Sequence, residues 1–337
     1  MQENIDLKPL SYMKIGGQGK YLIEVEHEND LRKVFEIKAA EKLPIVILGE
    51  GSNTIFSDNF HNKVFVKINL TDIIKTYEDT NAVNIEVGAG CNWDDLVEWS
   101  VKNKFSGLES LSGIPGSVGA SPIQNIGAYG SEVSETITHV KIYDLSSGKF
   151  YEVSNIESDF RYRDSIFKRN LGEFIITSVS FRLSKKEPEM PTYKDVSLYF
   201  LSKKKKYPTL KEIRDAVLEI RSNKLPNPEI DPNCGSFFKN PILLNEELVN
   251  IVEKFPLIPQ YKFSDTETKL SGGWLIEMSG FKGKKFENIR VSDKNALVLI
   301  SNGKAGFNEL EDVIKNISDG VMKNFGVKIE VEPNFII

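Results

Sequence analysis

The spacing of apolar residues predicts a strand–helix–strand unit near the start of the chain. Residues 21–25 and 45–48 are short apolar runs, and between them Leu31, Val34 and Phe35 recur at the spacing of one helical face. The second apolar run stops abruptly at a sequence of small and polar residues that begins with Gly49. We therefore expect a tight turn directly after a buried strand.

Further apolar runs predict a larger set of strands. Residues 64–68, 83–87 and 174–183 favour single strands, and residues 140–144 and 150–153 favour the two strands of a hairpin.

Two helices are also predicted in this part of the chain. One is indicated by apolar and small residues at helical spacing, namely Trp93, Leu96, Val97 and Ser100. The other begins at Thr209, which forms a capping box with Glu212.

The pattern changes after residues 224–228, where two prolines fall close together. Beyond this candidate boundary we expect two helices, a strand at residues 296–300, a helix near residues 308–325 and a final strand. Because the chain is predicted to contain both helices and strands, we place it in the α+β class.

Composition narrows the function. The chain has 337 residues, 40% of them hydrophobic, which is enough for a substantial core. Its net charge is −5, and the longest basic run is only Lys203–Lys206, so nucleic acid is not an expected partner. Two cysteines and three widely spaced histidines predict neither a disulfide framework nor a metal site. No apolar run is long enough to span a membrane, and we expect a cytoplasmic protein.

Two of the glycine clusters do not fit known nucleotide-binding loops. Gly88 and Gly90 lie between a predicted strand and a predicted helix, but Trp93 stands where a dinucleotide-binding fingerprint needs a third glycine. Residues 16–19 are not followed by the Lys-Ser/Thr pair of a Walker loop. We expect ordinary turns at both places.

Two other clusters favour ligand binding. Residues 49–53 offer consecutive backbone N–H groups after a strand, which suits a diphosphate, although an ordinary turn is an equal alternative for this cluster alone. Residues 112–130 contain five glycines and two prolines, so they cannot form a helix or a regular strand. A loop this rich in glycine favours a binding role, because its main chain can lie against a flat ring or a diphosphate.

These two loops, together with residues 162–168 (YRDSIFK) and residues 235–241 (GSFFKNP), closely resemble the UDP-N-acetylenolpyruvoylglucosamine reductase family. The resemblance runs from about Gly16 to Ile336. It implies an FAD enzyme of cell-wall precursor synthesis that uses NADPH to reduce the enolpyruvyl ether of a UDP-sugar to UDP-N-acetylmuramate. Residues 192–195 resemble the tyrosine-bearing insertion of the type I branch.

The resemblance also implies a fold and a domain division. The fold is α+β, with a two-part FAD-binding unit of the vanillyl-alcohol-oxidase type and a smaller α+β substrate domain. The implied boundaries are residues 1–70 and 71–223 for FAD, the latter with residues 326–337, and residues 224–325 for the substrate. The enzyme is expected to be a monomer that binds FAD noncovalently.

Site residues follow from the matched motifs. FAD would be held by Gly49, Glu50, Gly51, Ser52, Asn53, Thr54, Ile114, Pro115, Gly119, Ala120, Ser121, Ile123, Gln124 and Gly127. The UDP-sugar would be held by Tyr129, Tyr193, Lys224, Asn240 and Asn295. The catalytic groups would be Arg163, Ser236 and Glu332.

Two positions depart from the family pattern. The family often ends in Glu-Pro-Glu-Val before Phe-Ile, and aligning on Pro333 would place Asn334 at the catalytic glutamate. Counting from the flanking residues on both sides selects Glu332 instead. Asn295 stands where some relatives have Gln, which leaves its contact with the substrate open.

Each catalytic residue also has a plainer interpretation. Arg163 has the planar fork that fits a carboxylate, but it could pair with the adjacent Asp164 on the surface. Ser236 could be a turn hydroxyl, and it lacks the surroundings of a hydrolase serine. Cys234 favours a buried small residue over a nucleophile. Glu332 could be a charged residue of an edge strand.

Two rival functions remain at the level of sequence. One is another flavin oxidoreductase of the same fold that acts on an alcohol or a sugar. Many such enzymes attach FAD to a histidine or cysteine, and neither glycine loop here contains a histidine. The other is a UDP-sugar-binding protein without activity, which bound flavin would argue against.

Overall fold

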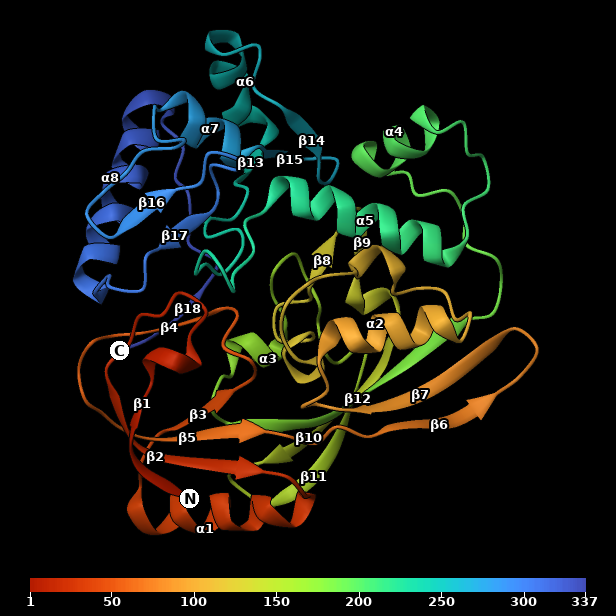
Figure 1. The fold of residues 1–337 in the computed structure, drawn as a ribbon, viewed down its shortest axis with the longest axis vertical. Coiled ribbons are helices and arrows are strands. Elements are labelled where there is room, and N and C mark those ends of the chain that lie inside the picture. The colour runs from red at the N-terminus through yellow and green to blue at the C-terminus, as the bar shows by residue number, and fades with distance from the viewer. The chain divides into compact units, whose positions relative to one another are not determined.

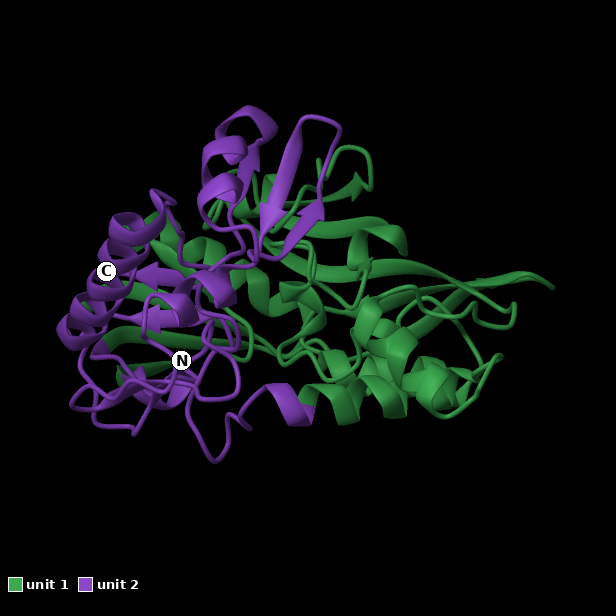
Figure 2. Cartoon of the chain, turned by 90° about the horizontal axis from the view of Figure 1, so that it is seen from above, with its two compact units in different colours: residues 1–5, 19–50, 60–221 green, residues 6–18, 51–59, 222–337 purple.

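The computed structural model describes residues 1–337, and the chain divides into two compact units (Figure 2). Unit 1 contains residues 1–5, 19–50 and 60–221, and unit 2 contains residues 6–18, 51–59 and 222–337. Each unit is therefore built from segments that are far apart in the sequence. The three-part division by ligand stays a prediction, because compactness does not assign a ligand to a segment.

Unit 1 contains two large sheets, a two-stranded sheet of β8 and β9, and five α-helices (Figure 1). Its strands are β1 (Gln2–Asp6), β2 (Gln18–Val25), β3 (Ile45–Leu48), β5 (His61–Ile68), β6 (Ile73–Glu78), β7 (Ala82–Gly88), β8 (Gly127–Ala128), β9 (Ser131–Glu132), β10 (Ile137–Asp144), β11 (Lys149–Ser154) and β12 (Phe174–Ser184). Its helices are α1 (Leu31–Glu41), α2 (Trp93–Lys102), α3 (Ile166–Arg169), α4 (Lys194–Ser202) and α5 (Leu210–Lys224).

The first sheet confirms the predicted strand–helix–strand unit. Its order is β1-β2-β5-β3, and β5 pairs in parallel with both β2 and β3. Helix α1 lies along this sheet (Figure 1), and its Leu31 and Val34 are fully buried in one core with Ile23 and Val66 of the strands. Parallel pairing requires such a crossover helix, so the apolar face of α1 and the sheet bury each other.

The second sheet has the order β11-β10-β12-β7-β6, and its paired strands are antiparallel. The predicted hairpin is confirmed as β10 and β11, in which Asp144 pairs with Lys149. The Asp144 carboxylate accepts hydrogen bonds from the N–H groups of Ser146 and Ser147, at 2.9 and 2.6 Å. Hydrogen bonding, first from the Ser146 hydroxyl, lowers the pKa of Asp144 to about 2. This aspartate therefore closes the hairpin turn in its charged form.

Helix α2 confirms the predicted buried face, because Trp93, Leu96, Val97 and Ser100 are all fully buried. Asn92 caps the helix by accepting a hydrogen bond from the Asp95 N–H at 3.1 Å. The Trp93 Nε1–H donates to the Leu111 carbonyl at 2.9 Å. The tryptophan is thus packed inside the protein at the place where a dinucleotide-binding fold needs a glycine.

Unit 2 is a smaller α+β body. Its strands are β4 (Thr54–Phe56), β13 (Ile242–Leu244), β14 (Gln260–Lys262), β15 (Glu267–Leu270), β16 (Ile289–Val291), β17 (Leu299–Ser301) and β18 (Asn334–Ile336). Its helices are α6 (Asn245–Lys254), α7 (Gly272–Met278) and α8 (Phe307–Phe325). Six residues of α8 are buried at helical spacing and form much of the core, namely Phe307, Leu310, Val313, Ile317, Val321 and Phe325.

One strand of unit 2 lies later than the sequence indicated. The prediction placed it at residues 296–300, whereas β17 spans Leu299–Ser301. The Asn295 side chain accepts a hydrogen bond from the Leu297 N–H at 3.0 Å, and its carbonyl accepts one from the Val298 N–H at 3.0 Å. This asparagine turn uses the first apolar residues of the run, so regular pairing begins after it.

No helix is both long enough and apolar enough to cross a bilayer.

Candidate functional site

The two predicted ligand loops of unit 1 lie against each other. A Cβ added to Gly49 would stand 2.7 Å from the Ser117 Oγ and 3.6 Å from the Ala120 Cβ, so only glycine permits this approach. The Asn92 Nδ2 donates to the Glu50 Oε1 at 2.7 Å and ties the start of the first loop to the N-terminal cap of helix α2. The structure therefore combines the two clusters into one surface.

The glycine-rich loop turns its polar groups inward and leaves small and apolar residues accessible. Ser117, Ser121 and Asn125 are buried, and the Ser121 hydroxyl donates to the Val118 carbonyl at 2.7 Å. The predicted FAD residues that are partly accessible are Gly119, Ala120, Ile123, Gln124 and Gly127, while Pro115 is exposed and Ile114 is partly buried. Small, apolar side chains that leave the backbone accessible suit a flat ring system.

The rest of the first loop belongs to unit 2. Gly51 has a φ of +74°, and a Cβ there would stand 1.8 Å from the Leu10 carbonyl oxygen. This glycine is therefore required by the packing of the protein on itself, and a larger residue would disturb folding as well as any ligand. Ser52 and Asn53 complete the turn, which continues into β4 at Thr54, and the Asn53 carbonyl accepts a hydrogen bond from the Asn334 N–H at 3.0 Å.

The Arg163 side chain lies against the glycine-rich loop. Its Nη2 donates to the Gly127 carbonyl at 2.8 Å, and its guanidinium lies over the Tyr162 ring, 5.2 Å from the ring centre. The neighbouring Asp164 accepts a hydrogen bond from Arg169. The structure thus places a cation at the loop predicted to hold FAD.

The two tyrosines predicted to hold the UDP-sugar also lie together. The rings of Tyr129 and Tyr193 meet edge to face, with their centres 5.4 Å apart. Burial raises the pKa of the Tyr129 hydroxyl, and the Arg221 side chain, which hydrogen bonds to it, opposes that change. Burial lowers the pKa of Arg221.

An ion pair missed by the sequence analysis fixes the start of the glycine-rich loop. The Arg214 guanidinium on α5 holds the Asp94 carboxylate at both oxygens, with distances of 2.6 and 2.8 Å. Asp94 also accepts the Gly113 N–H at 2.6 Å. Burial opposes the charge of Asp94, but these hydrogen bonds outweigh it and lower the pKa of the carboxyl.

In unit 2 the structure brings Ser236 and Glu332 onto adjacent segments. Ser236 pairs with Val298, and the neighbouring Phe237 carbonyl accepts a hydrogen bond from the Glu332 N–H at 2.8 Å. Phe237 is fully buried and fixes the segment in the core. Burial, and then the charge of Glu332, raise the pKa of the Cys234 thiol, so this cysteine stays neutral and is not a nucleophile.

The remaining predicted substrate residues of unit 2 fall into two groups. The Asn240 Oδ1 accepts a hydrogen bond from the Gly272 N–H at 2.9 Å. The Asn295 side chain lies beside the next residue of α7, because a Cβ added to Gly273 would be 3.6 Å from its Oδ1. Lys224 is exposed at the end of α5.

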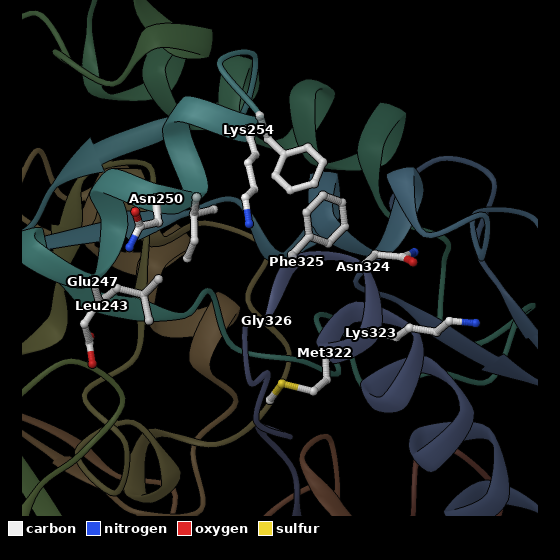
Figure 3. A pocket seen from close by; sticks show the side chains of 11 residues that line it. Leu243, Glu247, Asn250, Lys254, Met322, Lys323, Asn324, Phe325 and Gly326 are labelled. Atoms are coloured by element: carbon white, nitrogen blue, oxygen red, sulfur yellow. The ribbon is translucent and has the colours of Figure 1, made fainter.

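Unit 2 also has a groove of about 490 Å³ (Figure 3). Strand β13, helix α6 and the end of α8 form it, and its lining includes Ile251, Phe255 and Phe325. None of the predicted site residues lines this groove, and we assign it no part in the reaction.

The predicted site residues thus form two sets, one in each compact unit. Unit 1 contains Gly49, Glu50, the glycine-rich loop, Tyr129, Tyr193 and Arg163, while unit 2 contains residues 51–54, Lys224, Asn240, Asn295, Ser236 and Glu332. The sequence analysis missed Asp94, Arg221, Asn125 and Lys168. Asn125 and Lys168 carried a signal, because both lie inside motifs on which the resemblance rests. Asn125 lies in the glycine-rich loop, where its buried amide donates to Glu132 at 2.7 Å, and Lys168 ends residues 162–168.

Comparison with known proteins covers the whole chain. Residues 19–154 match the FAD binding domain model, and residues 227–336 match the model of the UDP-N-acetylenolpyruvoylglucosamine reductase C-terminal domain. The UDP-N-acetylenolpyruvoylglucosamine reductase of Flavobacterium johnsoniae is 40% identical, with 100% of this chain and 99% of the relative covered. The enzyme of the same name from Salmonella typhimurium is 37% identical over 98% of this chain and 95% of its own length.

A solved structure supports the same fold. The reductase of this name from Thermus caldophilus aligns with a TM-score of 0.68 at 22% identity, and the alignment covers 99% of this chain and 98% of that one. The predicted fold, an FAD-binding unit of the vanillyl-alcohol-oxidase type with a smaller α+β substrate domain, is confirmed. With two family models and full-length relatives above 30% identity in agreement, the chain belongs to the UDP-N-acetylenolpyruvoylglucosamine reductase family.

Proposed function

We propose that the chain performs the reaction of its family with Arg163, Ser236 and Glu332 as the catalytic groups. The enzyme is an FAD-dependent oxidoreductase that uses NADPH to reduce UDP-N-acetylenolpyruvoylglucosamine to UDP-N-acetylmuramate in peptidoglycan precursor synthesis. FAD, when bound, carries the hydride from NADPH to the sugar substrate.

The loops of unit 1 are suited to hold FAD. Gly49 and the accessible Gly119, Ala120 and Gly127 have no large side chains, and residues 51–54, which belong to unit 2, offer further backbone and hydroxyl groups. Neither loop contains a histidine or a cysteine, which supports noncovalent binding. No metal takes part in this proposal.

The observation that carries the proposal is the position of Arg163 against the glycine-rich loop, where its Nη2 donates to the Gly127 carbonyl at 2.8 Å. Reduction of a double bond conjugated to a carboxylate sends negative charge toward that carboxylate. A guanidinium can meet both carboxylate oxygens and stabilise this charge as it develops.

Ser236 is proposed to supply the proton. Once hydride has added to the terminal enolpyruvyl carbon, the adjacent carbon takes a proton from the Ser236 hydroxyl. Glu332 is proposed to hydrogen bond to the enolate region. Glu332 lies on the segment bonded to Phe237, next to Ser236, whereas Asn334 is bonded to Asn53. This difference supports Glu332 over Asn334 as the catalytic residue, as counting from the flanking residues indicated.

The UDP-sugar is proposed to contact Tyr129 and Tyr193 through their rings, Lys224 through its charge, and Asn240 and Asn295 through their amides. The contact between the two tyrosine rings, and the place of the two asparagines beside the adjacent residues Gly272 and Gly273, support this assignment. All proposed groups come from one chain. This chain has a net charge of −5 and no long basic stripe. We therefore propose a cytoplasmic monomer that binds neither nucleic acid nor membrane.

Anaerobic mixing tests the function as a whole. NADPH should bleach the flavin absorbance of the purified protein, and UDP-N-acetylenolpyruvoylglucosamine should then restore it. Flavin that is bleached by NADPH but not restored by the sugar would contradict the proposed reaction and favour another flavin oxidoreductase.

Replacement of Ala120 by leucine is expected to weaken FAD binding by about 10–100-fold, because three added carbons would fill the accessible face of the loop. The ratio of flavin to protein absorbance and the Kd for FAD measure this effect. Ala40→Leu, the same change at an exposed position of α1, is the control. An Ala120→Leu protein that retains its full FAD content would show that the cofactor does not cover this face.

Lys224→Ala is expected to raise the KM for the UDP-sugar by about tenfold and to leave reduction of FAD by NADPH unchanged. The lysine is proposed to bind a part of the substrate remote from the reacting carbons. Lys211→Ala, which removes an exposed lysine of the same helix that pairs with Asp215, is the matched control. Equal KM values for the Lys224→Ala and Lys211→Ala proteins would remove Lys224 from the site.

A further inference from the structure

The segment that carries Arg163 is attached to the glycine-rich loop by the short helix α3 (Ile166–Arg169) and its capping residue Ser165. The Ser165 hydroxyl donates to the Ile123 carbonyl at 2.6 Å and accepts a hydrogen bond from the Lys168 N–H at 3.3 Å. Phe167, in the middle of α3, is fully buried in the core of unit 1. The helix is therefore fixed to both the loop and the core.

The Lys168 ammonium joins the same two parts of the chain. Its Nζ donates to the Gln124 Oε1 at 3.3 Å and to the Arg163 carbonyl at 3.1 Å. The side chain is half-buried, and both acceptors are neutral oxygens. Hydrogen bonds from a charged donor are stronger than those between neutral groups, so this link is well suited to hold a geometry.

The backbone that Lys168 holds is strained. Arg163 has a φ of +54°, a left-handed conformation that is unfavourable for a residue other than glycine. Arg161 and Asp164 exchange backbone hydrogen bonds of 2.9 and 3.2 Å across this turn. The lysine donates to the carbonyl at its centre, which keeps the arginine in the conformation that reaches Gly127.

We propose that Lys168 is a positioning residue that holds the Arg163 turn and Gln124 in one fixed arrangement, so that the guanidinium meets the carboxylate of the substrate in the correct orientation. Lys168 itself does not touch the reacting atoms. This inference rests on the proposed function, because it assumes that Arg163 binds the enolpyruvyl carboxylate.

The proposal predicts a loss of discrimination rather than a general loss of binding. Two probes are titrated into the FAD-loaded protein without NADPH, and the change in the flavin spectrum is followed. One is UDP-N-acetylenolpyruvoylglucosamine, and the other is UDP-N-acetylglucosamine, which lacks the carboxylate. Lys168→Met should lower the preference for the carboxylate-bearing sugar by about tenfold, since a misplaced cation loses orientation and not charge. The affinity for UDP-N-acetylglucosamine should stay within about threefold of that of the unchanged protein.

Two further variants separate positioning from structure. Lys141→Met removes another half-buried lysine of unit 1, one that pairs with Glu28, and should leave the preference unchanged. Lys168→Arg keeps a cationic donor and should recover part of the preference. Should Lys168→Met fail to fold, Lys168→Gln carries the test, because it keeps an N–H donor and loses only the charge.

The outcomes distinguish this proposal from the proposed function. The role of Arg163 itself would be overturned by either of two results. One is a protein without substitutions that shows no preference for the carboxylate-bearing sugar, and the other is an Arg163→Met protein that keeps this preference. If Arg163→Met loses the preference and the Lys168 variant retains it, only the role of Lys168 is overturned. An equal loss of affinity for both sugars in Lys168→Met would also overturn it, since that result indicates a general structural role.

Discussion

Replacement of Arg163 by methionine is expected to slow reoxidation of reduced FAD by the enolpyruvyl sugar by about 10³-fold. Methionine keeps a long side chain but removes the fork that stabilises the carboxylate as charge develops. Loss of one preorganised donor to a developing charge typically costs ~10²–10³-fold, and Arg163 can supply two hydrogen bonds together with a full charge. Reduction of FAD by NADPH should change by less than about threefold, because the carboxylate takes no part in that step.

Stopped-flow absorbance of the flavin measures the two half-reactions separately. Arg161→Met is the matched control, because Arg161 lies in the same segment and forms an exposed ion pair with Asp159 at 2.9 Å. Exposed pairs of this kind contribute only ~0–1 kcal/mol, so the control should fold and react normally. If Arg161→Met slows reoxidation as much as Arg163→Met does, the effect belongs to the segment and not to the guanidinium beside Gly127.

Much of the fold could be predicted because local pattern and burial agree. Consecutive apolar residues are buried in β2 (Leu22 and Ile23) and in β5 (Val64 to Val66), as expected for parallel strands covered on both faces, and the helical spacing in α1 and α2 marks their buried sides. The shift of β17 shows the limit of this reasoning. A short apolar run does not reveal that the Asn295 side chain will hold its first residues in a turn.

The supporting groups of the site could not be predicted, because they act across long sequence separations. Arg214 meets Asp94 across 120 positions, and Lys168 meets Gln124 across 44. On a helix, such charged residues have the same pattern as solvent-exposed ones. The sequence therefore indicated the loops and the groups that we propose to react, but not the residues that hold them in place.

The glycines show a related ambiguity. The sequence indicated that Gly49 and Gly51 leave room for a ligand, and the structure shows that each also leaves room for the protein itself, against Ser117 and Leu10 respectively. A glycine-rich segment thus reports close approach without saying which partner approaches. For this reason Ala120, whose side chain is partly accessible, is a better position than Gly51 for testing the FAD surface.

Replacement of Ser236 by alanine is expected to slow reoxidation of reduced FAD by the enolpyruvyl sugar by ~10²–10⁴-fold, the usual contribution of a positioned proton donor. The loss of one hydroxyl should not unfold the protein. Ser236 is only half-buried, and the packing of its segment depends on the fully buried Phe237 and Phe238. Reduction of FAD by NADPH should proceed almost normally, because no substrate proton moves in that half-reaction.

Ser279→Ala provides the control for this prediction, since it makes the same change in unit 2 at a buried hydroxyl that has no hydrogen-bond partner. Its two half-reactions should match those of the unchanged protein. Equal slowing of both half-reactions in Ser236→Ala would indicate a defect in folding or in flavin binding, and normal reoxidation would exclude Ser236 as the donor.

A second measurement tests the proton transfer itself. If the Ser236 hydroxyl delivers the proton, reoxidation should be slower in D₂O than in water for the unchanged enzyme, because a proton in flight slows when it is replaced by deuterium. Since Glu332 lies on the segment bonded to Phe237, its replacement by glutamine should slow the same half-reaction and leave this solvent effect in place.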